Sequence, residues 1–132
     1  MMTDLTPLLS EPGASIAVIG ATDHRFKYGG IIYRDLKRKG YKVYAVNPYR
    51  ETVEGEPCWT SVKDLPEVPT IVDFVVPAER GLEVLEECEA AGALNIWLQP
   101  GAESPALMEK LDASPFNWVA HACIMVRASL VR

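Results

Sequence analysis

The chain has 132 residues, of which 48% are hydrophobic and 23% charged, which suits a single globular domain with a buried core. These proportions exclude a disordered chain, a coiled coil and a collagen, and no apolar run reaches the roughly 18 residues that a membrane-spanning helix needs. The net charge of −5, from 13 basic and 18 acidic residues, argues against a nucleic-acid-binding protein, because such proteins present broad basic surfaces.

The first half of the chain predicts two buried strands joined by a helix. In chain order, the predicted elements are a short helix over 3–9, a strand over 15–19, a helix over 28–39 and a strand over 42–46. Both strands are apolar runs bounded by turn residues, as buried strands are. In the helix, Tyr28, Ile31, Ile32 and Leu36 fall on one face, and Gly40 follows as a stop signal.

The second half predicts three more strands and two longer helices. In chain order, the predicted elements are a loop or small hairpin over 52–57, a helical turn over 61–64, a strand over 70–76, a helix over 78–91, a strand over 94–98, a helix over 104–111, a strand over 118–120 and a short helix or tail over 124–131. Ser104 is the predicted cap of its helix, with Pro105 at the first position. Asp73 lies inside an apolar strand, so we expect a buried, hydrogen-bonded carboxyl group.

Apolar strands that are mostly separated by helices indicate a parallel sheet covered on both faces. With right-handed crossovers, the fold class is α/β, a doubly wound five-stranded sheet in the order 3-2-1-4-5, and residues 1–132 form one domain. In such sheets, ligands bind outside the carboxyl ends of the strands, where the strand order reverses. The loops that follow four of the predicted strands are therefore the candidate site.

The loop after the first strand has features of a phosphate site. Gly20 permits a tight turn, and backbone amides with the Thr22 hydroxyl are suited to hold a phosphate at the start of the next helix. Lys27 and the Gly29-Gly30 pair strengthen this interpretation. The alternative is a plain turn between a strand and a helix.

The loop after the second strand argues against NAD. The GxGxxG fingerprint is absent, and the strand ends in Asn47-Pro48 where an NAD site has an acidic residue for the ribose. Arg50 is suited to meet a phosphate on the ribose, which leaves NADP open. The alternative is that Asn47-Pro48 only ends the strand.

The loops after the third and fourth strands complete the candidate cleft. Val76-Pro77 places a rigid apolar segment beside it, either to pack against an adenine ring or merely to redirect the chain. Gln99 opens a compact turn and is a candidate for ligand contact, whereas we expect Trp97 in the core.

The basic residues are concentrated in one segment. Residues 25–50 hold 8 basic residues and 1 acidic residue, and the rest of the chain holds 5 basic and 17 acidic residues. A confined basic segment favours a small anionic ligand. Lys37, Arg38 and Lys39 have an alternative role, since cations stabilise the end of a helix.

No catalytic or metal-binding motif appears in the sequence. GxSxG, HExxH and the Walker lysine motif are absent, and Cys123 has no neighbour that would activate it, so we expect a packing role for this thiol. The 3 cysteines are far apart and the first residues do not form a secretory signal. We therefore expect a cytoplasmic protein with reduced thiols and without catalytic activity of its own.

Six motifs together resemble the small stand-alone CoA-binding domain proteins of bacteria. They are, in chain order, Ile16-Ala-Val-Ile-Gly-Ala-Thr22, Lys27-Tyr28-Gly29, Gly40-Tyr-Lys-Val43, Val46-Asn47-Pro48, Val75-Val76-Pro77 and Trp97-Leu-Gln-Pro-Gly-Ala102. The resemblance covers about residues 14–127 and implies a Rossmann-like fold. The chain is also similar to the CoA-binding part of the succinyl-CoA synthetase α subunit, but that enzyme needs a further domain and a β subunit that lie outside this chain.

The resemblance implies a role for each candidate residue. It implies that Gly20, Ala21 and Thr22 contact the CoA phosphates, beside Lys27 and Tyr28. It implies that Asn47, Pro48 and Arg50 lie on the side of the adenosine 3′-phosphate. Val76 and Pro77 would lie near the adenine or the pantetheine, with Gln99 further along the cleft. We expect binding of coenzyme A or an acyl-CoA, with no nucleic acid or membrane partner. The alternatives are an NADP-binding redox protein and an interaction module with a vestigial cleft.

Overall fold

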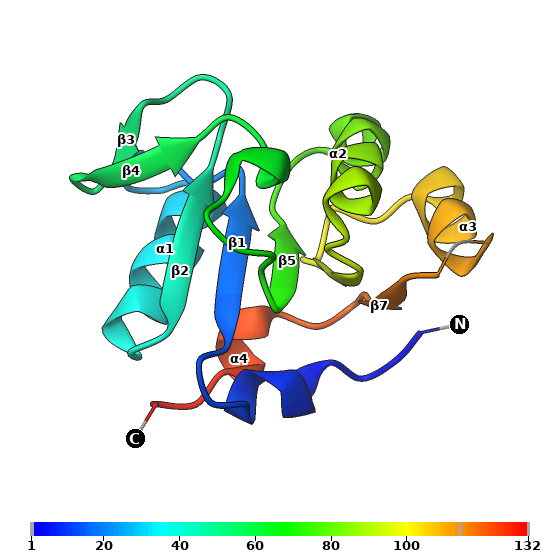
Figure 1. Ribbon diagram of the computed structural model, residues 1–132, viewed down its shortest axis with the longest axis horizontal. Helices are drawn as coiled ribbons and strands as arrows, with labels where there is room; N and C mark the ends of the chain where they lie inside the picture. Colours follow the sequence, from blue (N-terminus) through cyan, green and yellow to red (C-terminus); the bar gives the residue numbers. More distant parts are fainter. Residues whose placement is uncertain (1, 114, 132) are drawn as a thin grey trace.

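The computed structural model describes residues 2–113 and 115–131, in which helices cover both faces of one sheet (Figure 1). The elements are, in chain order, η1 (Thr6–Ser10), β1 (Ser15–Ile19), α1 (Tyr28–Arg38), β2 (Lys42–Val46), β3 (Thr52–Val53), β4 (Glu56–Trp59), η2 (Val62–Asp64), β5 (Ile71–Phe74), α2 (Ala78–Ala91), β6 (Asn95–Leu98), α3 (Pro105–Ala113), β7 (Asn117–Val119) and α4 (Ile124–Arg127), where η marks a 3₁₀ helix. The predicted α/β class is confirmed.

The sheet of the described residues has seven strands in the order β3-β4-β2-β1-β5-β6-β7. All neighbouring strands are parallel except β3 and β4. The predicted count of five strands was wrong, because the segment over 52–57 adds β3 and β4 to the sheet. The predicted order 3-2-1-4-5 was correct in part: the second predicted strand lies beside the first and the fourth beside the fifth, but the third, β5, lies beside β1 and not beside β2. The order of the predicted strands is 2-1-3-4-5, so the strand order reverses between β1 and β5.

The small hairpin over 52–57 explains this correction. The hairpin is present, and its turn residues Glu54 and Gly55 have φ angles of 50° and 76°, as a two-residue turn with the twist of the strands requires. Its second strand, β4, pairs with β2 through Ala45 opposite Cys58. The edge of β2 is therefore occupied before the chain reaches β5, which pairs with the free edge of β1.

Two hydrophobic cores lie on the two faces of the sheet. The helices α1, α4 and η1 cover one face, where Ile32 and Leu36 of α1 are fully buried. The helices α2 and α3 cover the other face. Trp97 is fully buried and its Nε1 donates to the Ala122 carbonyl at 2.8 Å, so its predicted core position is confirmed. None of the helices in the described ranges has the length and apolar composition needed to cross a bilayer.

The first turn of α1 corrects one predicted core position. Tyr28 is 67% exposed, whereas Tyr33, outside the predicted face, is 1% exposed. Helical side chains lean toward the N-terminus of their helix. Because Tyr28 is the first residue of α1, its ring points away from the helix and lies near the carboxyl ends of the strands instead of packing on the sheet.

Asp73 is buried as predicted, but its expected hydrogen bonds are absent. Within the described residues, neither carboxylate oxygen has a hydrogen-bond partner. Its register neighbours in the sheet are Val18 and Trp97, and the single donor of Trp97 is used by Ala122. Burial raises the pKa of the Asp73 carboxyl well above its ordinary value, because an uncompensated charge is costly in an apolar core.

Candidate functional site

Two cavities adjoin at the carboxyl ends of the central strands. The first has a volume of about 770 Å³ and lies between the loop after β2 and helix α2. The second has a volume of about 700 Å³ and lies between the first turn of α1 and the loop after β6. Both are lined by Gly20, Lys27, Val75, Val76 and Pro77. They therefore form one elongated cleft at the point where the strand order reverses, as the topology predicts.

At the junction of the two cavities, Gly20 and Gly29 allow two backbone segments to pack closely together. Gly20 has a φ angle of +96°, and a Cβ atom there would lie 2.6 Å from the Val75 carbonyl oxygen. A Cβ atom on Gly29 would overlap with the Gly20 carbonyl oxygen. The loop after β1 thus touches the first turn of α1 backbone to backbone, and the predicted tight turn at Gly20 is present.

Lys27 stands immediately before α1, at the junction of the two cavities. No described side chain caps this end of the helix, and its first turn holds no acidic residue. The first amides of a helix lack intrahelical partners and carry a partial positive charge, which favours an anion. Lys27 adds a full charge at the same place.

Three predicted contact residues have structural partners. Ala21 and Thr22 are buried, and the Thr22 hydroxyl accepts from the His24 amide at 3.1 Å. Asn47 ties two loops together, because its Nδ2 donates to the Ala21 carbonyl at 2.9 Å and its Oδ1 accepts from the Tyr49 amide at 2.9 Å. Ala21 and Thr22 line neither cavity, whereas Asn47 and Pro48 line the first.

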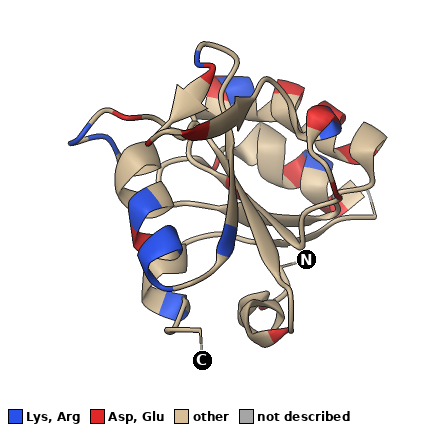
Figure 2. Cartoon of the chain, turned by 60° about the vertical axis from the view of Figure 1, so that its left-hand side comes forward, with Lys and Arg blue, Asp and Glu red and all other residues tan. Residues whose placement is uncertain are grey.

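The basic segment over 25–50 is divided among several places (Figure 2). Lys37 and Arg38 lie in the last turn of α1, at the end remote from the cleft. Arg50 lines neither cavity, and its Nη1 lies 3.4 Å from Asp23 Oδ2. Of the predicted basic contacts, the structure brings Lys27 to the cleft and directs Arg50 to a neighbouring loop.

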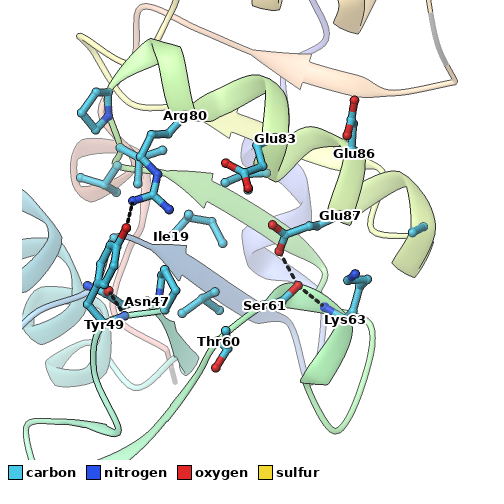
Figure 3. Close-up of a pocket in the computed structure, with 18 of the residues that line it drawn as sticks. Ile19, Asn47, Tyr49, Thr60, Ser61, Lys63, Arg80, Glu83, Glu86 and Glu87 are labelled. Atoms are coloured by element: carbon cyan, nitrogen blue, oxygen red, sulfur yellow. Dashed lines mark hydrogen bonds between the residues drawn. The ribbon is translucent and has the colours of Figure 1, made fainter.

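The α2 wall of the first cavity carries charges of both signs (Figure 3). Helix α2 contributes Arg80 at one end and Glu83, Glu86 and Glu87 along the remainder. Across from them, the Ser61 hydroxyl donates to Glu87 and accepts from the Lys63 amide. On the α2 wall, an anion is therefore favoured toward the end that holds Arg80, on the side of Lys27, while Lys63 is a further cation on the opposite wall.

The second cavity is lined mainly by apolar and backbone groups. Phe26 is 81% exposed and stands at its rim with Tyr28. Gln99 lines the wall, its Oε1 accepts from the Ile124 amide at 2.8 Å, and its Nε2 lies 3.4 Å from Cys123 Sγ. Cys123 was expected to be a packing residue. It is half-buried and also lines this cavity, so part of its surface faces the cleft.

Several residues of the cleft were not among the predicted contacts. They are Phe26, Tyr49, Lys63, Arg80, Gly101, Ala102 and Cys123. Arg80 did carry a signal, because a basic residue in the first turn of a helix opposes the helix dipole. The others face the cleft through loop conformations that local sequence patterns do not encode. No group of three or more potential metal ligands occurs among the described residues.

Comparison with known proteins agrees with this geometry. Residues 14–129 match the model of a family described as "CoA binding domain". The chain is 40% identical over 102 residues to an ADP-forming acetate–CoA ligase of Archaeoglobus fulgidus, and 37% identical over 82 residues to the α subunit of such a ligase from Pyrococcus furiosus. These matches cover 73% and 61% of this chain, but only 15% and 18% of the respective relatives.

Solved structures show the same fold. A conserved hypothetical protein from Pyrococcus furiosus superposes with a TM-score of 0.83 at 41% identity, over 86% of this chain and 97% of that one. A hypothetical protein from Pyrococcus horikoshii gives a TM-score of 0.85 at 29% identity, over 94% and 87%. A dinucleotide-forming acetyl-coenzyme A synthetase of Ca. Korarchaeum cryptofilum gives 0.71 at 27% identity, over 92% of this chain and 28% of that one.

Proposed function

This chain belongs to the CoA-binding domain family, and from that membership we propose that it binds coenzyme A or an acyl-CoA in the cleft at the carboxyl ends of its strands. The observation that carries the proposal is the form of the cleft, two cavities that meet at Gly20 and Lys27. Coenzyme A has a matching form, since a diphosphate joins a nucleotide to a long pantetheine arm. The function proposed is binding, without a reaction.

The diphosphate is assigned to the junction of the cavities. Lys27 supplies a charge there, and the uncapped first turn of α1 supplies amides. Gly20 lines both cavities through its backbone, and a side chain is excluded there because its Cβ would lie 2.6 Å from the Val75 carbonyl oxygen. Ala21 and Thr22 are buried and line neither cavity, so we assign them to holding the loop beside the diphosphate through their contacts with Asn47 and His24.

The two ends of the ligand are assigned to the two cavities by the chemistry of the residues that line each one. The first cavity is the more highly charged and takes the nucleotide, near Asn47 and Pro48. The second is largely apolar and takes the pantetheine arm, with Gln99 toward the thiol end. Val76 and Pro77 line both cavities and pack against whichever part of the ligand crosses them.

Thermal unfolding with a panel of ligands tests the proposal. A ligand that is present at about 100 times its dissociation constant stabilises a protein by about 2.7 kcal/mol, which is a shift of several degrees for a domain of this size. We expect the largest shift with CoA or acetyl-CoA and smaller shifts with ADP, NAD and NADP. A larger shift with NADP would favour a redox protein, and no shift with any of them would favour an interaction module.

Lys27→Ala tests the assignment of the diphosphate. The change removes a charge at the junction without disturbing the core, since Lys27 is exposed. We expect CoA to bind about tenfold more weakly, the usual effect of losing one charge-assisted hydrogen bond. Lys110→Ala, at an exposed position of α3, is the control and should leave the affinity unchanged. Equal affinity of Lys27→Ala and the parent protein in a calorimetric titration would contradict the assignment.

A further inference from the structure

Two arginines are neighbours of Tyr49, Arg50 in the sequence and Arg80 across the first cavity, and they differ in what surrounds their charge. Arg50 lies toward the loop after β1, where the Asp23 carboxylate partly neutralises it at 3.4 Å. Asp23 also accepts from the Glu54 amide at 2.6 Å, which fixes it in that place. Arg50 is therefore engaged away from the cleft.

Arg80 lines the cavity and keeps its full charge. In the part of the chain that the structure describes, no carboxylate forms an ion pair with it. Its partner is the neutral Tyr49: Nη1 lies 3.4 Å from the hydroxyl oxygen, and the guanidinium carbon lies 5.4 Å from the ring centre (Figure 3). A guanidinium held in this way retains donors for an anion.

The position of Arg80 is not explained by the stability of its helix. It is the third residue of α2, where the helix dipole disfavours a cation. Further along the same helix, Glu83, Glu86 and Glu87 line the cavity and repel anions (Figure 3). A phosphate group in this cavity thus has one favourable location on α2, the end that holds Arg80.

Tyr49 is the residue that holds the Arg80 side chain in place. Tyr49 is 80% exposed and lines the first cavity, so its ring is accessible to a ligand. The Asn47 side chain fixes its backbone, and the Arg80 guanidinium packs on its face. Tyr49 and Arg80 therefore bring a flat ring and a cation together across the mouth of the cavity, from a loop on one side and a helix on the other.

We propose that Arg80 binds the phosphate on the ribose of the nucleotide, so that this site selects CoA over dephospho-CoA, and that Tyr49 is the positioning residue for its guanidinium. The proposal rests on the proposed function and assigns to Arg80 the contact that the sequence had suggested for Arg50. A guanidinium matches a phosphate through paired hydrogen bonds, and dephospho-CoA lacks only the 3′-phosphate that would accept them.

The test measures the affinities of CoA and dephospho-CoA by calorimetry for the parent protein, Arg80→Gln and Arg50→Gln. We expect the parent to prefer CoA by about tenfold or more, as for a charge-assisted contact. Arg80→Gln should bind CoA about tenfold more weakly and dephospho-CoA with unchanged affinity, so that the preference disappears. Arg50→Gln should keep the preference of the parent.

Each other outcome has a distinct meaning. Loss of the preference in Arg50→Gln, or equal weakening of both ligands in Arg80→Gln, would overturn the role of Arg80. Equal binding of both ligands to the parent protein would overturn it as well, and would leave the proposed function standing. Binding of neither ligand to the parent would overturn the proposed function together with this inference.

Tyr49→Phe tests the positioning role separately. The change keeps the ring and removes the hydroxyl that accepts from Arg80. We expect the preference for CoA to fall by about two- to threefold while the affinity for dephospho-CoA stays constant, since the hydroxyl only orients the guanidinium through a long 3.4 Å contact and the charge itself remains. An unchanged preference would contradict the role of Tyr49.

Discussion

Gly29→Ala should destabilise the protein by about 3 kcal/mol, which corresponds to a fall in Tm of about 10 °C for a domain of this size. The added Cβ would overlap with the Gly20 carbonyl oxygen, and neither backbone segment can move without separating α1 from the loop after β1. The same separation would open the junction of the two cavities. We therefore expect CoA binding to be lost along with the stability.

Gly81→Ala is the matched control for this substitution. Gly81 is also a buried glycine near the start of a helix, but a Cβ there would meet a terminal methyl group of the Leu107 side chain, at 2.8 Å, and no backbone atom. Because alanine favours the helix by up to about 1 kcal/mol, we expect a small change of either sign. Thermal unfolding and a CoA titration on both variants measure the difference. A Gly29→Ala protein as stable as Gly81→Ala would contradict the packing described at the junction.

The second large effect concerns Asp73 and the pH dependence of stability. Because burial raises the pKa of this carboxyl, the folded protein holds a proton that the unfolded chain releases above about pH 4. The free energy of unfolding therefore falls as the pH rises from there toward the raised pKa, by up to about 1.4 kcal/mol per pH unit. Asp73→Asn cannot ionise and should lack this fall.

The comparison of Tm values between pH 4 and pH 9 tests this prediction. We expect Asp73→Asn to gain stability over the parent protein progressively as the pH rises. Asp64→Asn, an exposed carboxyl on η2, is the control and should follow the parent. Parallel profiles of Asp73→Asn and the parent protein would show that the buried carboxyl does not govern the pH dependence.

The class of the fold and the location of the cleft could be predicted from the sequence, because both depend on local patterns. Apolar runs and glycine stops mark the strands and helices, and the rule for ligand sites in parallel sheets then selects the loops at Gly20 and Pro77. The strand order was not predictable in the same way. The short hairpin of β3 and β4 decides which edge β5 can pair with, and apolar periodicity carries no information about edges.

The positions of the charged side chains in the site could also be predicted only in part. Lys27 could be assigned to the cleft because it stands at the predicted start of a helix beside the glycine loop. Arg50 and Arg80 could not be distinguished, since their roles depend on contacts with Asp23 and Tyr49 across long sequence separations. The predicted partners of Asp73 were likewise absent among the described residues: its register neighbours are Val18, which has no polar side-chain group, and Trp97, whose donor is used by Ala122.

The central claim is that CoA occupies the cleft formed at the strand ends, and amide chemical shifts recorded during a titration with CoA test it most directly. We predict that the largest shift changes occur at Gly20, in 27–30, at Val76 and in 99–102, on the two sides of the junction. The changes should saturate with one ligand per chain. Changes concentrated around the groove beside 129–131, or no changes at all, would contradict the claim.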